Sequence, residues 1–123
     1  MAHILLVDDD DLVRNALHKT LVRAGHDVEE APDGAAALAA FGRRRCDVVI
    51  TDIIMPKAEG LDMIRALRRL DPAVKIIAMS GGGIGKAGDY LDMARKFGAT
   101  RVLAKPFSGG EIVAAVSDVL AGR

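Results

Sequence analysis

The chain has 123 residues, half of them hydrophobic, which suits one domain with a buried core and leaves no room for a second. Its 17 Lys and Arg residues balance 17 Asp and Glu residues, so the charge does not indicate nucleic-acid binding. The single cysteine, Cys46, excludes an internal disulfide, and we expect an inert buried thiol. No stretch is long and uncharged enough to span a membrane, and the N-terminal apolar run is too short for a signal peptide. We therefore expect a cytoplasmic protein.

Strand-like and helix-like patterns alternate along the first part of the chain. Residues 3–7 predict a strand, and apolar residues recur at helical spacing over residues 13–24 until Gly25 ends that helix. Residues 26–30 predict a weaker strand. A second helix opens at Asp33-Gly34, and its last turn carries three arginines, which suit a helix C-terminus: Arg43, Arg44 and Arg45.

The same alternation continues through the rest of the chain. Strands are predicted at residues 47–51, 74–79 and 100–104. Helices are predicted around three sets of apolar residues: Leu61, Ile64 and Leu67; Tyr90, Met93 and Phe97; and Ile112, Val116 and Leu120. The glycine-rich stretch 81–85 lacks the spacing of a nucleotide-binding loop, and we interpret it as a flexible connection. Regular alternation of this kind predicts a parallel sheet with helices on both faces.

Charged side chains follow three of the predicted strands. Asp8 and Asp9 come after the first strand, Asp52 after the third and Lys105 after the fifth. Because the carboxyl ends of parallel strands share one edge of a sheet, we expect three carboxylates and one ammonium in a single crevice. Two unit charges about 4 Å apart repel by about 4 kcal/mol at an effective dielectric of about 20, so this cluster favours a divalent cation such as Mg²⁺. We interpret the next acids, Asp10 and Asp11, as helix-capping residues.

Four motifs in this order resemble the receiver domain of two-component response regulators. They are Asp8-Asp9, Asp52-Ile53-Ile54-Met55-Pro56 with Gly60, Ser80 at the end of the fourth strand, and Lys105-Pro106-Phe107. The resemblance covers essentially the whole chain, residues 1–123, and implies a stand-alone response regulator with no output domain. It also implies a flavodoxin-like (βα)5 three-layer α/β sandwich whose parallel five-stranded sheet has the order 2-1-3-4-5.

The resemblance implies a role for each matched residue. Asp52 would be the phosphoryl acceptor, Lys105 the phosphate-binding lysine and Ser80 the switch hydroxyl. Mg²⁺ would be held by Asp8, Asp9, Asp52 and the backbone carbonyl of Ile54, with Asp8 acting mostly through water. The protein would then be a signalling switch that assists its own phosphorylation and dephosphorylation, and not an enzyme.

The implied partners are a sensor histidine kinase or histidine phosphotransfer protein, which donates the phosphoryl group, and a downstream protein that the sequence does not identify. We expect a monomer or a weak phosphorylation-dependent dimer, with neither nucleic acid nor membrane as a partner. The chain departs from the family pattern in two places. Val102 replaces the aromatic residue that many receivers carry on the fifth strand, and the glycine-rich stretch after Ser80 is longer than usual. We assign no role to His3, His18 or His26.

Two other functions fit parts of the pattern. Asp8-Asp9-Asp10 also matches the DxD motif of Mg²⁺-dependent phosphatases of the haloacid dehalogenase type, which would carry the covalent phosphate on Asp8 instead of Asp52. Those enzymes need no aspartate after the third strand. The second alternative, a degenerate receiver that only binds proteins, is disfavoured because the acceptor, metal and lysine positions are all intact.

Overall fold

A computed structural model of the protein describes residues 2–53, 59–80, 92 and 94–122. Its strands are β1 (His3–Val7), β2 (Asp27–Ala31), β3 (Val48–Asp52), β4 (Lys75–Ser80) and β5 (Arg101–Ala104). Its helices are α1 (Asp11–Arg23), α2 (Gly34–Arg43), α3 (Glu59–Leu70) and α5 (Gly109–Leu120). Tyr90 and Met93, two of the residues that predict a helix before β5, lie outside the described residues. Residues 94–97 are helical, and Gly98 follows them with a φ of +120°.

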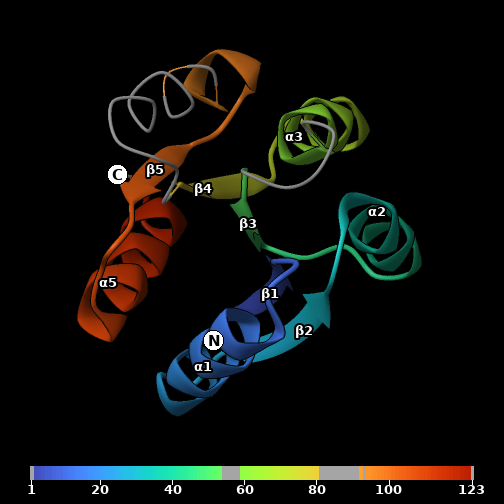
Figure 1. Cartoon of the computed structure of the whole chain (residues 1–123). Helices are drawn as coiled ribbons and strands as arrows, with labels where there is room; N and C mark the ends of the chain where they lie inside the picture. Colours follow the sequence, from blue (N-terminus) through green and yellow to red (C-terminus); the bar gives the residue numbers. More distant parts are fainter. Residues whose placement is uncertain (1, 54–58, 81–91, 93, 123) are drawn as a thin grey trace.

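The strands form one parallel five-stranded sheet with the order β2-β1-β3-β4-β5, as predicted. Helices α1 and α5 cover one face of this sheet, and α2 and α3 cover the other (Figure 1). The flavodoxin-like three-layer architecture is therefore confirmed.

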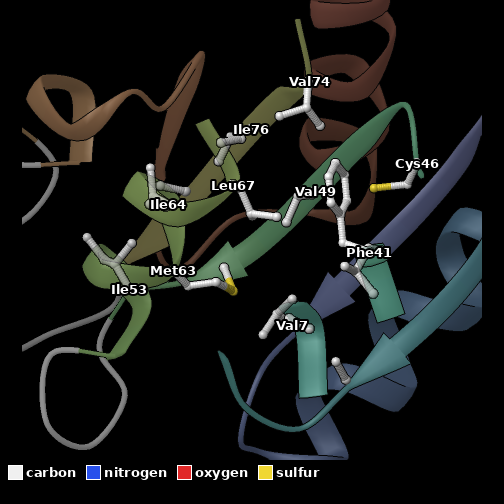
Figure 2. Packing of buried hydrophobic residues seen from close by; sticks show 14 of the residues in the cluster. Val7, Phe41, Cys46, Val49, Ile53, Met63, Ile64, Leu67, Val74 and Ile76 are labelled. Carbon is white, nitrogen blue, oxygen red and sulfur yellow. The ribbon is translucent and has the colours of Figure 1, made fainter. Parts of the chain in front are cut away.

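Side chains of the central strands alternate between two hydrophobic clusters, because successive residues of a strand point to opposite faces. In β1, Leu5 and Val7 join the cluster beneath α2 and α3, whereas Ile4 and Leu6 join the cluster beneath α1 and α5. Figure 2 shows the first cluster, in which Phe41 of α2 packs among residues of α3 and the strands. Both faces of the central strands are thus buried, which explains their nearly continuous apolar sequence.

Several predicted boundaries differ from the structure by one residue. Strands β2, β3 and β4 each begin and end one residue later than predicted. In β3 and β4 the hydrogen-bonded ladder continues past the apolar residues, to Asp52 and Ser80. Asp52 is therefore the last residue of β3 and does not follow it, and Ser80 ends β4, as its motif predicts. Helix α2 ends at Arg43 with Arg44 as its C-cap, so of the three arginines predicted in the last turn only Arg43 lies in it, and Arg45 lies beyond the helix. Leu120 was expected on the buried side of the last helix, but it is 43% exposed because Val119 occupies the core position of that final turn.

Cys46 is a buried thiol, as expected: its side chain belongs to the cluster beneath α2 and α3. Burial raises its pKa to about 12. Within the described ranges, no helix has the length and apolar character that crossing a membrane requires.

Candidate functional site

The pairing of the strands brings the predicted site residues to one edge of the sheet. The register between β1 and β3 sets Asp8 beside Asp52. The register between β3 and β4 places Ser80 one residue beyond the partner of Asp52. Lys105 donates its backbone N–H to the carbonyl oxygen of Ser80 at 2.8 Å, which extends the ladder to the end of β5. The carboxyl edge of the sheet therefore carries these four residues in strand order.

The three predicted metal acids lie together. Carboxylate oxygens of Asp8, Asp9 and Asp52 all lie within 4.8 Å of one another. Asp8 is fully buried, Asp52 is nearly so, and Asp9 is exposed. Three convergent carboxylates are the oxygen donors that Mg²⁺ prefers.

Asp8 has one carboxylate oxygen that is satisfied and one that is not. Its Oδ1 accepts the backbone N–H of Asp10 at 2.9 Å. Its Oδ2 is buried and accepts no hydrogen bond from the described residues. Burial raises the pKa of Asp8, and the charges of Asp52 and Asp9 raise it further, against the opposing effects of the Asp10 N–H and Lys105. A buried carboxylate oxygen that accepts no hydrogen bond and lies beside two other carboxylates fits a bound divalent cation.

Lys105 supplies the positive charge of the site. Its Nζ lies 3.0 Å from Oδ2 of Asp52 and 3.7 Å from Oδ2 of Asp8. Burial by itself lowers the pKa of Lys105, but the hydrogen bond and charge of Asp52, together with Asp8, outweigh burial and leave the pKa raised. The ammonium therefore stays protonated at neutral pH. The Lys105–Pro106 peptide bond that follows is cis.

Ser80 adds a hydroxyl to the same edge. The residue is fully buried, and its Oγ has no hydrogen-bond partner among the described residues. A buried polar group left without a partner costs about 1–3 kcal/mol, so this hydroxyl is available to donate to an acceptor. Ile54, Met55 and Pro56, as well as the glycine-rich stretch 81–85, lie outside the described residues.

Gly60 allows α3 to pack closely against the strand end that carries Asp52. A Cβ atom at position 60 would lie 2.7 Å from Cα of Ile53 and 2.8 Å from the carbonyl oxygen of Asp52. Both are backbone atoms that cannot rotate away, so a larger side chain would displace either the helix or the strand end. This contact gives a physical reason for the glycine of the predicted motif.

The acids that follow the cluster cap α1, as predicted. Oδ1 of Asp10 accepts the backbone N–H groups of Leu12 at 2.9 Å and Val13 at 3.3 Å, and Asp11 lies in the first turn. The capping fixes the chain direction directly after Asp8 and Asp9.

The histidines lie outside the carboxylate cluster. His3 Nδ1 is 3.0 Å from Asp27, and His26 Nδ1 accepts the backbone N–H of Ala2 at 3.2 Å. His18 Nδ1 is 3.0 Å from Oε2 of Glu30. None of these contacts involves Asp52.

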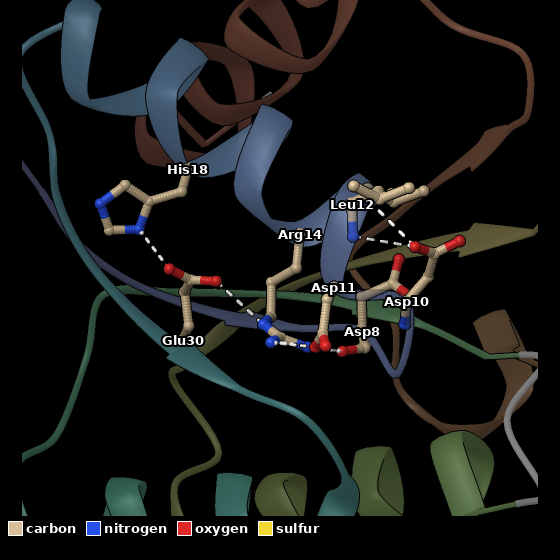
Figure 3. A network of polar contacts seen from close by, with 8 residues as sticks. Asp8, Asp10, Asp11, Leu12, Arg14, His18 and Glu30 are labelled. Carbon is tan, nitrogen blue, oxygen red and sulfur yellow. Dashed lines mark hydrogen bonds and ion pairs between the residues drawn. The ribbon is translucent and has the colours of Figure 1, made fainter.

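Arg14 contacts the site and was missed by the sequence analysis. Its guanidinium donates to the backbone carbonyl of Asp8, to Glu30 and to Asp11 (Figure 3). The spacing of Asp11 and Arg14, three residues apart at the start of a helix, is a sequence signal for their ion pair. Nothing in the sequence connects Arg14 to Asp8 or to Glu30 on β2, because both contacts depend on tertiary packing.

The chain is similar to known signalling proteins over nearly its whole length. The sequence model of the response regulator receiver domain matches residues 4–117. Chemotaxis protein CheY of Thermotoga maritima is 33% identical over 117 residues, which cover 94% of this chain and 95% of that protein. The crystal structure of a response regulator receiver domain protein from Clostridium thermocellum matches with a TM-score of 0.89 and 29% identity, covering 98% of this chain and 95% of that one.

Other relatives are longer than this chain. Transcriptional regulatory protein CseB of Streptomyces avermitilis is 33% identical over 120 residues, which cover 96% of this chain but 48% of CseB. The chain thus spans about half the length of such relatives, and 24% of DNA-binding transcriptional regulator NtrC of Azospirillum brasilense. These matches give no support to the haloacid dehalogenase phosphatase alternative. The family model matches residues 4–117, and the sheet of the structure has the strand order that the resemblance implied. The chain therefore belongs to the receiver domain family of two-component response regulators, which act in phosphorylation-dependent signalling.

Proposed function

We propose that Asp52 is the phosphoryl acceptor of this receiver domain and that Asp8, Asp9 and Asp52 hold Mg²⁺ beside it. The observation that carries the proposal is the contact of 3.0 Å between Lys105 Nζ and Asp52, next to three carboxylates within 4.8 Å of one another. The Ile54 carbonyl remains the fourth protein ligand that the family resemblance implies.

The reaction joins two anions, so its main requirement is positive charge at the point of contact. One carboxylate oxygen of Asp52 forms a bond to phosphorus while the bond from phosphorus to the leaving atom of the donor breaks. Lys105, whose ammonium is held against Asp52, is placed to neutralise a phosphoryl oxygen, and Ser80 is placed to donate its hydroxyl hydrogen to another. Mg²⁺, when bound, offsets the carboxylate charge and coordinates phosphoryl oxygen.

The phosphoryl donor is a histidine kinase or a histidine phosphotransfer protein, and the phosphorylated domain signals through contacts with another protein. In this proposal the chain acts as a switch that promotes its own phosphorylation and dephosphorylation, without turning over an external substrate. A role as a degenerate, purely protein-binding receiver is disfavoured by the intact grouping of Asp52, the two other acids and Lys105.

Phosphorylation by acetyl phosphate tests the proposal directly. In the presence of Mg²⁺, intact-mass analysis should show one added phosphoryl group on the wild type and none on Asp52→Asn. Asp33→Asn is the matched control, because Asp33 caps α2 through a hydrogen bond from the Ala36 N–H that an asparagine oxygen can also accept. Phosphate retained by Asp52→Asn and mapped to Asp8 would contradict the proposal.

A further inference from the structure

Arg14 ties three parts of the structure together at the carboxylate cluster. Its Nη1 donates to the backbone carbonyl oxygen of Asp8 at 2.7 Å, and its Nε donates to Oε1 of Glu30 at 2.9 Å. Its Nη2 donates to Oδ1 of Asp11. The side chain is 14% exposed, although it projects from the first turn of α1 (Figure 3). The guanidinium thus links the end of β1, the start of α1 and strand β2.

Asp8 is held at three points, and Arg14 supplies one of them. Its backbone N–H donates to the carbonyl of Ala31 at 3.2 Å, and its Oδ1 accepts from Asp10. The contact with Arg14 fixes the remaining backbone group, the carbonyl oxygen. With these three points fixed, Oδ2 is the part of Asp8 that is left to face Asp52 and Lys105.

The charge of Arg14 is already balanced by its own partners. Glu30 and Asp11 both accept from its guanidinium, so little positive charge remains to offset the carboxylate cluster. The contribution of Arg14 to the site is therefore its geometry: a planar group with several fixed donors bridges acceptors that lie in different directions. A lysine would keep the charge but lose this arrangement.

Glu30 fixes the other end of the link. It lies on β2, where the register pairs it with Leu6 of the central strand β1. Its Oε1 accepts from Arg14, and its Oε2 lies 3.0 Å from Nδ1 of His18 on α1. Both oxygens are engaged, so Arg14 is anchored to the sheet as well as to its own helix.

We propose that Arg14 is a positioning residue for Mg²⁺: by clamping the Asp8 carbonyl against Glu30, it sets the separation and direction of the metal-binding carboxylates. The inference rests on the proposed function, since it concerns the metal site of that function. Groups that orient metal ligands typically change metal affinity by about 10-fold to 100-fold when they are removed.

Mg²⁺ affinity, measured by isothermal titration calorimetry on the full chain, tests this role. Arg14→Gln and Arg14→Lys should each bind Mg²⁺ at least about 10-fold more weakly than the wild type. If Arg14→Gln does not fold, Glu30→Ala provides a second variant, because it leaves Arg14 in place and removes the oxygen that accepts from its Nε. Glu30→Ala should also weaken Mg²⁺ binding.

Arg68→Gln is the matched control. Arg68 also clamps backbone carbonyls, those of Pro72, Val74 and Gly98, but it does so near the amino ends of β4 and β5, at the opposite edge of the sheet. Its loss should lower the melting temperature and leave Mg²⁺ affinity within about twofold of wild type. Phosphorylation by acetyl phosphate adds a second readout: in Arg14→Lys the Mg²⁺ concentration for half-maximal rate should rise, while the rate at saturating Mg²⁺ should approach that of the wild type.

The outcomes separate this inference from the proposed function. A wild type that does not bind Mg²⁺ would overturn both. Wild-type affinity in Arg14→Lys would show that charge alone suffices, and would overturn the positioning role while leaving the proposed function intact. An equal loss of affinity in Arg68→Gln would overturn it as well, because the effect would then follow from general destabilisation.

Discussion

Replacing Asp8 with asparagine should stabilise the metal-free protein. Oxygens of Asp8 lie within 4.8 Å of those of Asp9 and Asp52, where two unit charges repel by about 3.5 kcal/mol at an effective dielectric of about 20. Lys105, at 3.7 Å, attracts the Asp8 carboxylate by about 4.5 kcal/mol on the same scale. The two repulsions outweigh the one attraction by about 2.5 kcal/mol, and the burial of the charge adds to the imbalance.

The asparagine keeps the shape of the side chain, and its Oδ1 can still accept the N–H of Asp10. Water around the exposed Asp9 weakens one of the two repulsions. We therefore expect Asp8→Asn to raise the free energy of unfolding by about 1–3 kcal/mol without metal, and to lose most of the further stabilisation that Mg²⁺ gives the wild type.

The pH dependence of stability provides a separate check. Because burial raises the pKa of Asp8 in the folded state above 3.8, the folded protein binds more protons than the unfolded chain between the two pKa values. The Asp8 contribution therefore lowers the stability of the metal-free wild type as the pH rises through that interval. This contribution should be missing from Asp8→Asn, so the difference in stability between the two proteins should shrink as the solution is acidified.

Urea unfolding in a chelator and in excess Mg²⁺ measures these effects. Asp10→Asn is the control, since it removes a neighbouring charge outside the carboxylate cluster, and the amide oxygen can still cap α1. Its free energy of unfolding should stay within about 0.5 kcal/mol of wild type. A metal-free Asp8→Asn that is less stable than the wild type would refute the reasoning, because attraction to Lys105 would then exceed both repulsions.

Three further predictions concern other residues. Asp9→Asn should lose most of the rise in melting temperature that Mg²⁺ produces, and should raise the metal-free melting temperature less than Asp8→Asn does, because solvent around the exposed Asp9 weakens its repulsion of Asp8. Ser80→Ala removes an unsatisfied buried hydroxyl, so urea unfolding should show unchanged or slightly higher stability, by up to about 1 kcal/mol, while mass analysis still finds phosphate on Asp52. The Cys46 thiol, with a pKa of about 12 against 9.0, should resist Ellman's reagent in the native protein at pH 8. Above pH 9 the Cys46 thiol of the unfolded chain is deprotonated while that of the folded protein is still protonated. The wild type should therefore lose stability relative to Cys46→Ala by about 1.4 kcal/mol per pH unit. Equal pH dependence of the two proteins would contradict this.

The central strands were the most predictable part of the fold. Their runs of apolar residues are buried on both faces, so composition alone marks them. The edge strand β2 is less distinct, because its sequence is Asp-Val-Glu-Glu-Ala and its side chains are mostly exposed or half-buried. The strand order came from the family resemblance, since alternation of strands and helices predicts parallel pairing but not which strands are neighbours.

The grouping of charged residues was predictable for a simple geometric reason. Each residue follows or ends a strand, and parallel strands place such positions at the same edge. The sequence did not indicate which oxygens would be satisfied. Oδ1 of Asp8 accepts a hydrogen bond from Asp10, whereas Oδ2 accepts none from the described residues. This difference depends on the turn between β1 and α1. The link from Arg14 to Glu30 joins residues 16 positions apart on a helix and an edge strand, and neither periodicity nor a local motif specifies it.

The buried polar atoms near Asp52 differ in whether the chain supplies their hydrogen-bond partners. Thr51 is buried next to Asp52, but its hydroxyl donates to the Asp52 carbonyl oxygen at 3.0 Å and is satisfied within the chain. Four buried side-chain atoms in the described part of the chain have no hydrogen bond, and two of these are histidine nitrogens that face Glu29 at 3.7 Å and Glu30 at 3.0 Å. The other two are Oδ2 of Asp8, which lies 3.7 Å from Nζ of Lys105, and Oγ of Ser80, and both lie at the carboxyl edge of the sheet.

Oδ2 of Asp8, directly after β1, and Oγ of Ser80, at the end of β4, thus lie on either side of Asp52. If Asp52 is the phosphoryl acceptor, as proposed, a metal-bound phosphoryl group there would bring a positive ion toward Asp8 and an anionic oxygen toward Ser80. Phosphorylation would then supply partners to both atoms, neither of which forms a hydrogen bond among the described residues.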